Sequence, residues 1–170
     1  SQVYDGGPGR DGIPSIDRPK FKDISFINYL NDNDLVVGIK QNGVTKVYPH
    51  KILNWHEIVN DEVGGEPIAI TYCPLTGSAL GWGRVVDGNT TTFGVSGLLY
   101  NNNLIPYDRA TESNWSQMRA EGISGKMAGE KPKNYDIIET TWETWKEMFP
   151  NSLVLTRETG FNRKYDFYPY

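Results

Sequence analysis

Along most of this chain, apolar residues either alternate with polar ones or form short continuous runs, which is the pattern of β-strands. Residues 35–41 and 44–48 flank Asn42-Gly43, a dipeptide that favours the positive φ angles of a two-residue hairpin turn. We therefore expect a hairpin there. Similar turn signals predict two further hairpins, which pair residues 80–86 with residues 90–95 and residues 97–100 with residues 104–108.

A central strand is predicted at residues 67–73, where the run Pro-Ile-Ala-Ile-Thr-Tyr-Cys is almost entirely apolar or β-branched. Cys73 closes this strand. Pro74 has no backbone donor and restricts Cys73 to an extended conformation. Residues 74–78 are therefore expected to leave the sheet as a tight loop, with the Cys73 thiol at its mouth.

Two segments show helical spacing. Within residues 50–60, apolar residues and His56 recur at intervals of three and four, which predicts a short amphipathic helix with His56 on its inner face. Residues 141–149 place three aromatic side chains on one face and predict a second helix that covers a sheet. A last strand is expected at residues 152–156.

The whole chain, residues 1–170, is expected to form a single domain, because its length is typical of one hydrophobic core. Residues 11–21 carry two prolines and spaced apolar residues, and residues 1–25 are interpreted as an N-terminal arm that wraps the surface. The aromatic tail at residues 165–170 is expected to dock back on the domain. The predicted fold class is mainly β (α+β), a partly closed antiparallel β-barrel or rolled sheet with two or three short helices.

The composition of the chain excludes some classes of partner. The net charge is −4 and the lysines and arginines are scattered, so no basic surface for a nucleic acid is expected. No apolar run approaches the ~20 residues of a membrane span. The polar first residues do not form a signal segment, which indicates that any leader has been removed. Glycosylation-type triplets at Asn89 and Asn114 favour an extracytoplasmic protein that is secreted, periplasmic or on the cell surface. The expected partner is a small molecule or a metal ion.

Candidate chemistry centres on Cys73, the only cysteine, and on His56. A thiol at the end of a rigid strand, beside loop amides, is placed to act as a thiolate or a nucleophile, although a lone cysteine is often just a small buried residue. His56 has the acidic neighbour Glu57, which could tune its protonation, although a histidine on an apolar helix face is often a hydrogen-bonded core residue.

These residues permit two chemical constructions. Cys73 and His56, with His50 as a third ligand and Met118 or Met127 as a weak axial one, provide the soft sulfur and imidazole groups that copper prefers. His50 is otherwise interpreted as solvent-exposed. In the second construction His56 acts as the base for a Cys73 nucleophile, and an arginine, Arg109 or Arg119, stabilises the developing negative charge.

A third candidate region is the polar stretch at residues 107–117, which mixes carboxylates, a guanidinium, hydroxyls and an amide around an aromatic ring. Asp108, Trp115 and Gln117 are the expected cofactor- or ligand-binding residues of this stretch. Its alternative interpretation is a hydrogen-bonded connection in which the Asp and Arg side chains pair with each other.

Five strings of the chain are long and compositionally unusual. They are Asp-Gly-Ile-Pro-Ser-Ile-Asp at residues 11–17, His-Glu-Ile-Val-Asn-Asp at residues 56–61, Thr-Tyr-Cys-Pro-Leu-Thr-Gly-Ser at residues 71–78, Ser-Gly-Leu-Leu-Tyr-Asn-Asn-Asn at residues 96–103, and Tyr-Asp-Arg through Trp-Ser-Gln at residues 107–117. As a set they resemble a bacterial and archaeal family catalogued as domain of unknown function 3179, over nearly the whole chain.

This resemblance implies a protein that is commonly exported, often behind a signal or lipoprotein leader, and it brings no established activity. It also implies a site at the Cys73 loop and the His56-Glu57 helix, whereas His50 lies outside the family motif. Our leading hypothesis is an exported redox or metal-binding protein in which Cys73 and His56 hold the ion, with copper as the expected metal. The alternatives are a cysteine-nucleophile enzyme with His56 as base, and a non-catalytic extracellular module that binds a ligand or glycan around Trp115 and Arg109.

Overall fold

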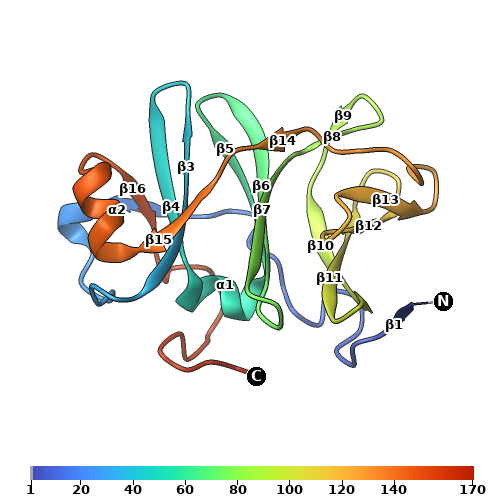
Figure 1. Ribbon diagram of the computed structural model, residues 1–170, viewed down its shortest axis with the longest axis horizontal. Helices are drawn as coiled ribbons and strands as arrows, with labels where there is room; N and C mark the ends of the chain where they lie inside the picture. Colours follow the sequence, from blue (N-terminus) through green and yellow to red (C-terminus); the bar gives the residue numbers. More distant parts are fainter. Residues whose placement is uncertain (1) are drawn as a thin grey trace.

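The computed structural model describes residues 2–170, which form three larger β-sheets, one two-stranded sheet, two α-helices and one 3-10 helix (Figure 1). The expected mainly β (α+β) class is confirmed, and one sheet is curled like half of a barrel. Among the described residues, no helix has both the length and the apolar character needed to cross a membrane.

The three larger sheets lie side by side, with the central sheet between the two others (Figure 1). The central sheet consists, in order, of β14 (Asn134–Tyr135), β7 (Ser78–Gly83), β6 (Glu66–Cys73) and β5 (Ile58–Val63). The β3 sheet consists of β15 (Ile138–Thr141), β3 (Leu35–Gln41), β4 (Val44–Pro49), β16 (Leu153–Leu155) and β2 (Phe21–Asp23). The β10 sheet consists of β1 (Val3–Asp5), β10 (Phe93–Tyr100), β11 (Asn103–Asp108), β12 (Asn114–Ser116) and β13 (Glu121–Ser124).

The remaining elements connect or cover these sheets. They are the 3-10 helix η1 (Ile24–Phe26), α1 (His50–His56), α2 (Trp142–Met148) and the small hairpin of β8 (Val85–Val86) and β9 (Asn89–Thr90).

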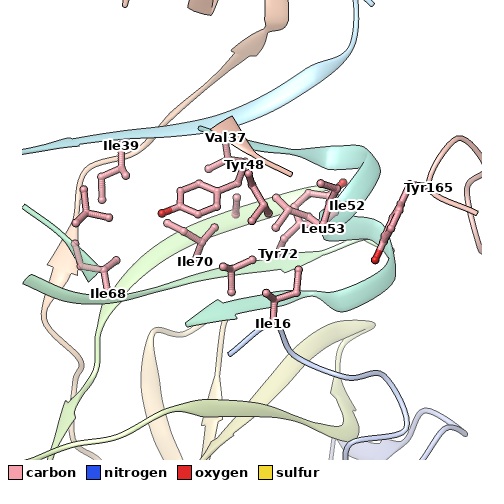
Figure 2. Packing of buried hydrophobic residues seen from close by; sticks show 14 residues of the cluster. Ile16, Val37, Ile39, Tyr48, Ile52, Leu53, Ile68, Ile70, Tyr72 and Tyr165 are labelled. Carbon is pink, nitrogen blue, oxygen red and sulfur yellow. The ribbon is translucent and has the colours of Figure 1, made fainter. Parts of the chain in front are cut away.

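Both faces of the central sheet are buried. Successive side chains of a strand point to opposite faces, so neighbouring residues of β6 pack in different clusters. Ile68, Ile70 and Tyr72 belong to the cluster shared with the β3 sheet and α1, which Figure 2 shows from close by. Ala69 and Cys73 belong instead to the cluster shared with the β10 sheet. The run at residues 67–73 is therefore almost continuously apolar, as expected of a strand without a solvent face.

Both faces of the β3 sheet are also covered. On the face away from the central sheet, Trp142 and Trp145 of α2 pack with Val36, Val47 and Val154. The helix begins at Trp142, where the side chain of Thr141 accepts a hydrogen bond from the backbone N–H of Thr144. The layers are thus α2, the β3 sheet, the central sheet and the β10 sheet.

Several predicted elements are confirmed. Residues 35–48 form the β3–β4 hairpin, with Gln41 opposite Val44 across a turn in which Asn42 and Gly43 both have positive φ. Residues 93–108 form the β10–β11 hairpin, which contains the strands expected at residues 97–100 and 104–108. The second helix and the last strand lie where expected.

Two predictions are wrong in part. The helix expected at residues 50–60 ends at His56, because the chain turns at Glu57 and the β-branched residues that follow pair with β6 as strand β5. The hairpin expected between residues 80–86 and 90–95 pairs only Val85–Val86 with Asn89–Thr90. The preceding strand, β7, pairs with β6 instead, across the tight turn after Cys73.

The N-terminal segment runs along the edge of β5. The backbone N–H of Ile16 donates to the carbonyl of Ile58, and the N–H of Asn60 donates to the carbonyl of Ile16. The Ile16 side chain is buried in the same cluster as Ile70 and Tyr72. This segment therefore fills a gap in the core as well as covering the sheet edge.

The contact between β3 and α2 generates a stability prediction. Gly38 lies under the ring of Trp145, and a Cβ added there would lie 2.1 Å from the nearest ring carbon. Gly38→Ala should therefore lower the free energy of unfolding by about 1–3 kcal/mol, the usual cost of overpacking a core. Denaturant unfolding measures this loss. Lys40→Ala, at an exposed position of the same strand, is the control, and an equal effect of the two substitutions would contradict this packing.

Candidate functional site

Glu57 occupies an unusual backbone position between α1 and β5. Its N–H donates to the carbonyl of Leu53 and closes the helix, and its φ and ψ angles are 64° and −31°. Its carbonyl accepts a hydrogen bond of 2.7 Å from the N–H of Tyr72. Glycine is the usual residue where a helix ends with positive φ, and another residue there carries strain of roughly 1–3 kcal/mol. The turn therefore holds a glutamate at a position where glycine would be more stable.

Glu57 lines an apolar pocket of about 50 Å³. A single buried water needs roughly 10–15 Å³, so the pocket accommodates a group of a few heavy atoms. The walls come from the N-terminal segment, the loop after β6, the strands β10 and β11, and the tail. The other lining residues are Gly6, Pro8, Ile13, Leu75, Val95, Gly97, Leu98, Leu99, Leu104 and Tyr170.

The apolar surroundings control the protonation of Glu57. Burial raises the pKa of its carboxyl to about 7, and a hydrogen bond from Tyr170 opposes that shift. The Tyr170 hydroxyl donates to Oε1 of Glu57 at 3.0 Å, and burial raises the pKa of this phenol in turn. Glu57 consequently exchanges its proton near neutral pH, where an ordinary glutamate is fully ionised.

His56 is buried and already fully hydrogen-bonded. Its Nδ1 donates to the carbonyl of Pro14 at 2.8 Å, and its Nε2 accepts from the hydroxyl of Tyr165 at 2.7 Å. Burial lowers the pKa of the imidazole to about 4. The ring is therefore neutral at physiological pH and ties the N-terminal segment to the tail.

Cys73 is buried behind the wall of the Glu57 pocket. Its thiol donates a weak hydrogen bond to the carbonyl of Asn102 at 3.6 Å. It packs in one cluster with Val95 and Leu104, which also line the pocket. Among the contacts of the described chain, none joins the Cys73 side chain to that of His56, whose partners lie on the N-terminal segment and the tail.

His50 lies at the other end of α1 from His56. Its Nδ1 is 3.3 Å from the Tyr72 hydroxyl, and its Nε2 is 3.7 Å from a carboxylate oxygen of Glu139. Burial lowers the pKa of its imidazole to about 4. Within residues 2–170, no group of three or more His, Cys, Asp or Glu side chains is arranged to hold a metal ion. His50, His56 and Cys73 are thus not brought together as a three-ligand set.

Arg109 holds the N-terminal segment against the β10 sheet. Its guanidinium lies 3.2 Å from the carboxylate oxygens of both Asp11 and Asp17 and donates to the hydroxyls of Ser15 and Thr92. Arg119, the other arginine considered, pairs with Glu121 instead. Both guanidiniums therefore stabilise ion pairs with carboxylates of this chain.

Asp108, Trp115 and Gln117 are buried in the β10 sheet and its contact with the central sheet. Asp108 accepts hydrogen bonds from the indole of Trp115 at 2.8 Å and from the N–H and hydroxyl of Thr111. Gln117 donates to the carbonyls of Thr71 and Ser78. These side chains bind one another and the backbone, so the segment serves as a hydrogen-bonded connection between sheets.

Sequence reasoning identified Glu57 as a neighbour of His56 but missed its pocket and its partner Tyr170. The aromatic tail was the available signal, since it was expected to dock on the domain. It does so through the Tyr168 hydroxyl, which donates to the carbonyl of Pro74, and through the carbonyl of Phe167, which accepts from the indole of Trp55. The tail thereby brings Tyr170 onto Glu57.

Residues 10–170 match the model of the family described as Protein of unknown function (DUF3179), so the chain belongs to that family. No curated protein and no solved structure matches the chain.

The raised pKa of Glu57 predicts how stability varies with pH. Between pH 4.5, the ordinary pKa of glutamate, and about 7, the folded chain keeps a proton that the unfolded chain releases. Glu57 should therefore contribute a decline in the free energy of unfolding as pH rises through this window, while the lowered pKa values of His50 and His56 contribute a rise between about 4 and 6.5. Glu57→Gln carries no such proton, so it should lack this decline and exceed the wild type at pH 8 by about 1–3 kcal/mol.

Denaturant unfolding at several pH values measures this difference. Glu62→Gln, at an exposed position of β5, is the matched control and should keep the decline. A Glu57→Gln curve parallel to that of the wild type would show that Glu57 does not titrate near 7.

Proposed function

We propose that this member of the DUF3179 family binds a small, largely apolar molecule in the Glu57 pocket and exchanges a proton with it through the Glu57 carboxyl. The observation that carries the proposal is a buried carboxyl with a pKa of about 7 in an apolar pocket. Perturbed carboxyls in clefts are typical of sites where protons are transferred, because a general acid or base works best with a pKa near the working pH.

The energetic cost of Glu57 supports a functional role. The residue combines a strained backbone with a buried carboxyl, and each of these lowers the stability of the fold. A different buried acid shows how such a cost is usually avoided: Asp61 accepts hydrogen bonds from the ammonium of Lys46 at 3.1 Å and from the hydroxyl of Tyr48 at 2.6 Å. Strain and incomplete charge compensation concentrate where a protein binds or reacts.

Tyr170 gives the carboxyl its orientation. Because its hydroxyl donates to Oε1, the other oxygen, Oε2, is the atom that we assign to the ligand. In the protonated form Oε2–H can donate to a ligand oxygen or nitrogen, and in the ionised form it can accept a ligand proton. The dry walls strengthen either interaction.

Copper binding and cysteine nucleophilicity, which rest on Cys73 and His56, require more rearrangement of side chains than the Glu57 proposal does. To ligate copper or to deprotonate the thiol, His56 would have to give up its hydrogen bond to Pro14 or to Tyr165. The thiol would also have to become accessible, since Cys73 is buried. We therefore place the Glu57 pocket first and keep copper binding and cysteine nucleophilicity as secondary proposals. An extracytoplasmic location is proposed on the sequence features alone.

The Glu57 proposal predicts both a titration and a binding event. Carbon-detected NMR of the glutamate carboxyls should show one group that titrates near pH 7. Addition of 1-butanol should shift the amide resonances of Val95 and Leu98 in a saturable way and raise the Glu57 pKa further, because the alcohol displaces water.

Leu98→Trp should fill the pocket and abolish the butanol response. Val85→Trp, which replaces an exposed apolar residue on β8, should leave that response intact. A Glu57 that titrates near 4.5, with no effect of butanol on the pocket residues, would overturn the proposed function.

The copper proposal makes a separate prediction. The wild-type protein should take up copper stoichiometrically with a sulfur-to-metal charge-transfer band, and Cys73→Ala should lose that band because it lacks the thiolate ligand. Metal analysis and absorption spectroscopy measure both. Equal copper uptake by the two proteins would contradict a role of Cys73 as a ligand.

A further inference from the structure

A second, wider cavity adjoins the Glu57 pocket. It has a volume of about 320 Å³ and lies between α1, the N-terminal segment and the tail. It shares Pro8, Ile13 and Tyr170 with the walls of the Glu57 pocket. We call this wider cavity the vestibule. The two spaces therefore adjoin each other at these three residues.

The vestibule differs from the inner pocket in its chemistry. It is lined by Arg163, which within residues 2–170 donates a hydrogen bond to the carbonyl of Asn162 and lies over the ring of Phe161. Most other cations near the site are paired with carboxylates, as Arg109 is with Asp11 and Asp17. Arg163 therefore presents a guanidinium whose charge no carboxylate of the described chain compensates.

Asn54 provides a second polar group in the vestibule. Its side-chain oxygen is buried, and within residues 2–170 it has no hydrogen-bond partner. A buried acceptor without a partner costs roughly 1–3 kcal/mol, and because solvent does not reach this oxygen, the Asn54 amide must rotate toward the vestibule before a ligand can donate a hydrogen bond to it and recover that cost. A hydroxyl or an amide N–H of the ligand supplies this donor.

We propose that the ligand of the Glu57 pocket is an anionic amphiphile: a short apolar chain enters the pocket, and a carboxylate with an adjacent hydroxyl or N–H stays in the vestibule against Arg163 and Asn54. This inference rests on the proposed function of Glu57 and specifies the class of molecule that it serves. The arrangement also keeps like charges apart, since the carboxylate lies with the guanidinium and the apolar end lies with Glu57.

Three matched probes test the proposal on the full chain: hexanoate, its neutral isostere hexanamide, and 2-hydroxyhexanoate. Titration followed by amide NMR gives each dissociation constant. Hexanoate should bind roughly tenfold or more tightly than hexanamide, which is the scale of one charge-assisted hydrogen bond. The hydroxy acid should bind more tightly than hexanoate, because its hydroxyl reaches Asn54.

Two substitutions assign the preference to Arg163. Arg163→Gln should weaken hexanoate binding by roughly tenfold and leave hexanamide unchanged. Lys164→Gln is the matched control, because Lys164 is the neighbouring cation and does not line the vestibule. It should leave the hexanoate affinity within about twofold of the wild type, since exposed charges contribute little.

The outcomes separate this inference from the function on which it rests. If hexanoate and hexanamide bind equally well and both shift the amide resonances of Val95 and Leu98, the proposed ligand pocket is supported and the anionic ligand is wrong. Equal losses in Arg163→Gln and Lys164→Gln would also overturn the role of Arg163. If none of the probes affects the pocket residues, the inference and the proposed ligand pocket both fall.

Discussion

Both faces of the central sheet are covered by other layers, and the rest of the structure follows from this burial. A strand in such a sheet has no solvent face, so its polar groups must find partners inside the protein. Asn60 shows the usual solution, because its amide exchanges hydrogen bonds with the backbone of Phe93 and donates to Asp17. Glu57 differs, since the residue lines an apolar pocket and its carboxyl has the hydroxyl of Tyr170 as its hydrogen-bond partner.

The two ends of the described chain complete the site that the sheets leave open. The N-terminal segment supplies Pro8 and Ile13 to the pocket walls and is held in place by the ion pairs of Arg109. The tail supplies Tyr170 and is anchored through Tyr165 on His56. His56 therefore acts as a tie between these two segments, and its neutral ring suits hydrogen bonds on both nitrogens. The histidine that attracts notice in the sequence supports the site, whereas its neighbour Glu57 lines it.

Local signals predicted much of the fold because they act over a few residues. Asn42 and Gly43 favour positive φ angles wherever they occur, and the β3–β4 hairpin formed as expected. The aromatic stripe of residues 141–149 likewise predicted α2. The end of α1 was misplaced because the helical spacing of apolar residues continues through Val59, while pairing of residues 58–63 with β6 overrides it. Strand pairing of this kind is non-local, so the partner of β7 was also misassigned.

The candidate site could be predicted only in part, because its arrangement also depends on non-local contacts. The sequence by itself determined the mainly β class, the strand that ends at Cys73, and the neighbourhood of His56 and Glu57 as a place for chemistry. Only the tertiary structure decided which of these groups faces a cavity. It buried Cys73 behind the pocket wall, engaged both nitrogens of His56, and brought Tyr170 from the far end of the chain onto Glu57. The pKa of a carboxyl and the accessibility of a thiol depend on desolvation by residues distant in sequence, and local pattern carries no information about those neighbours.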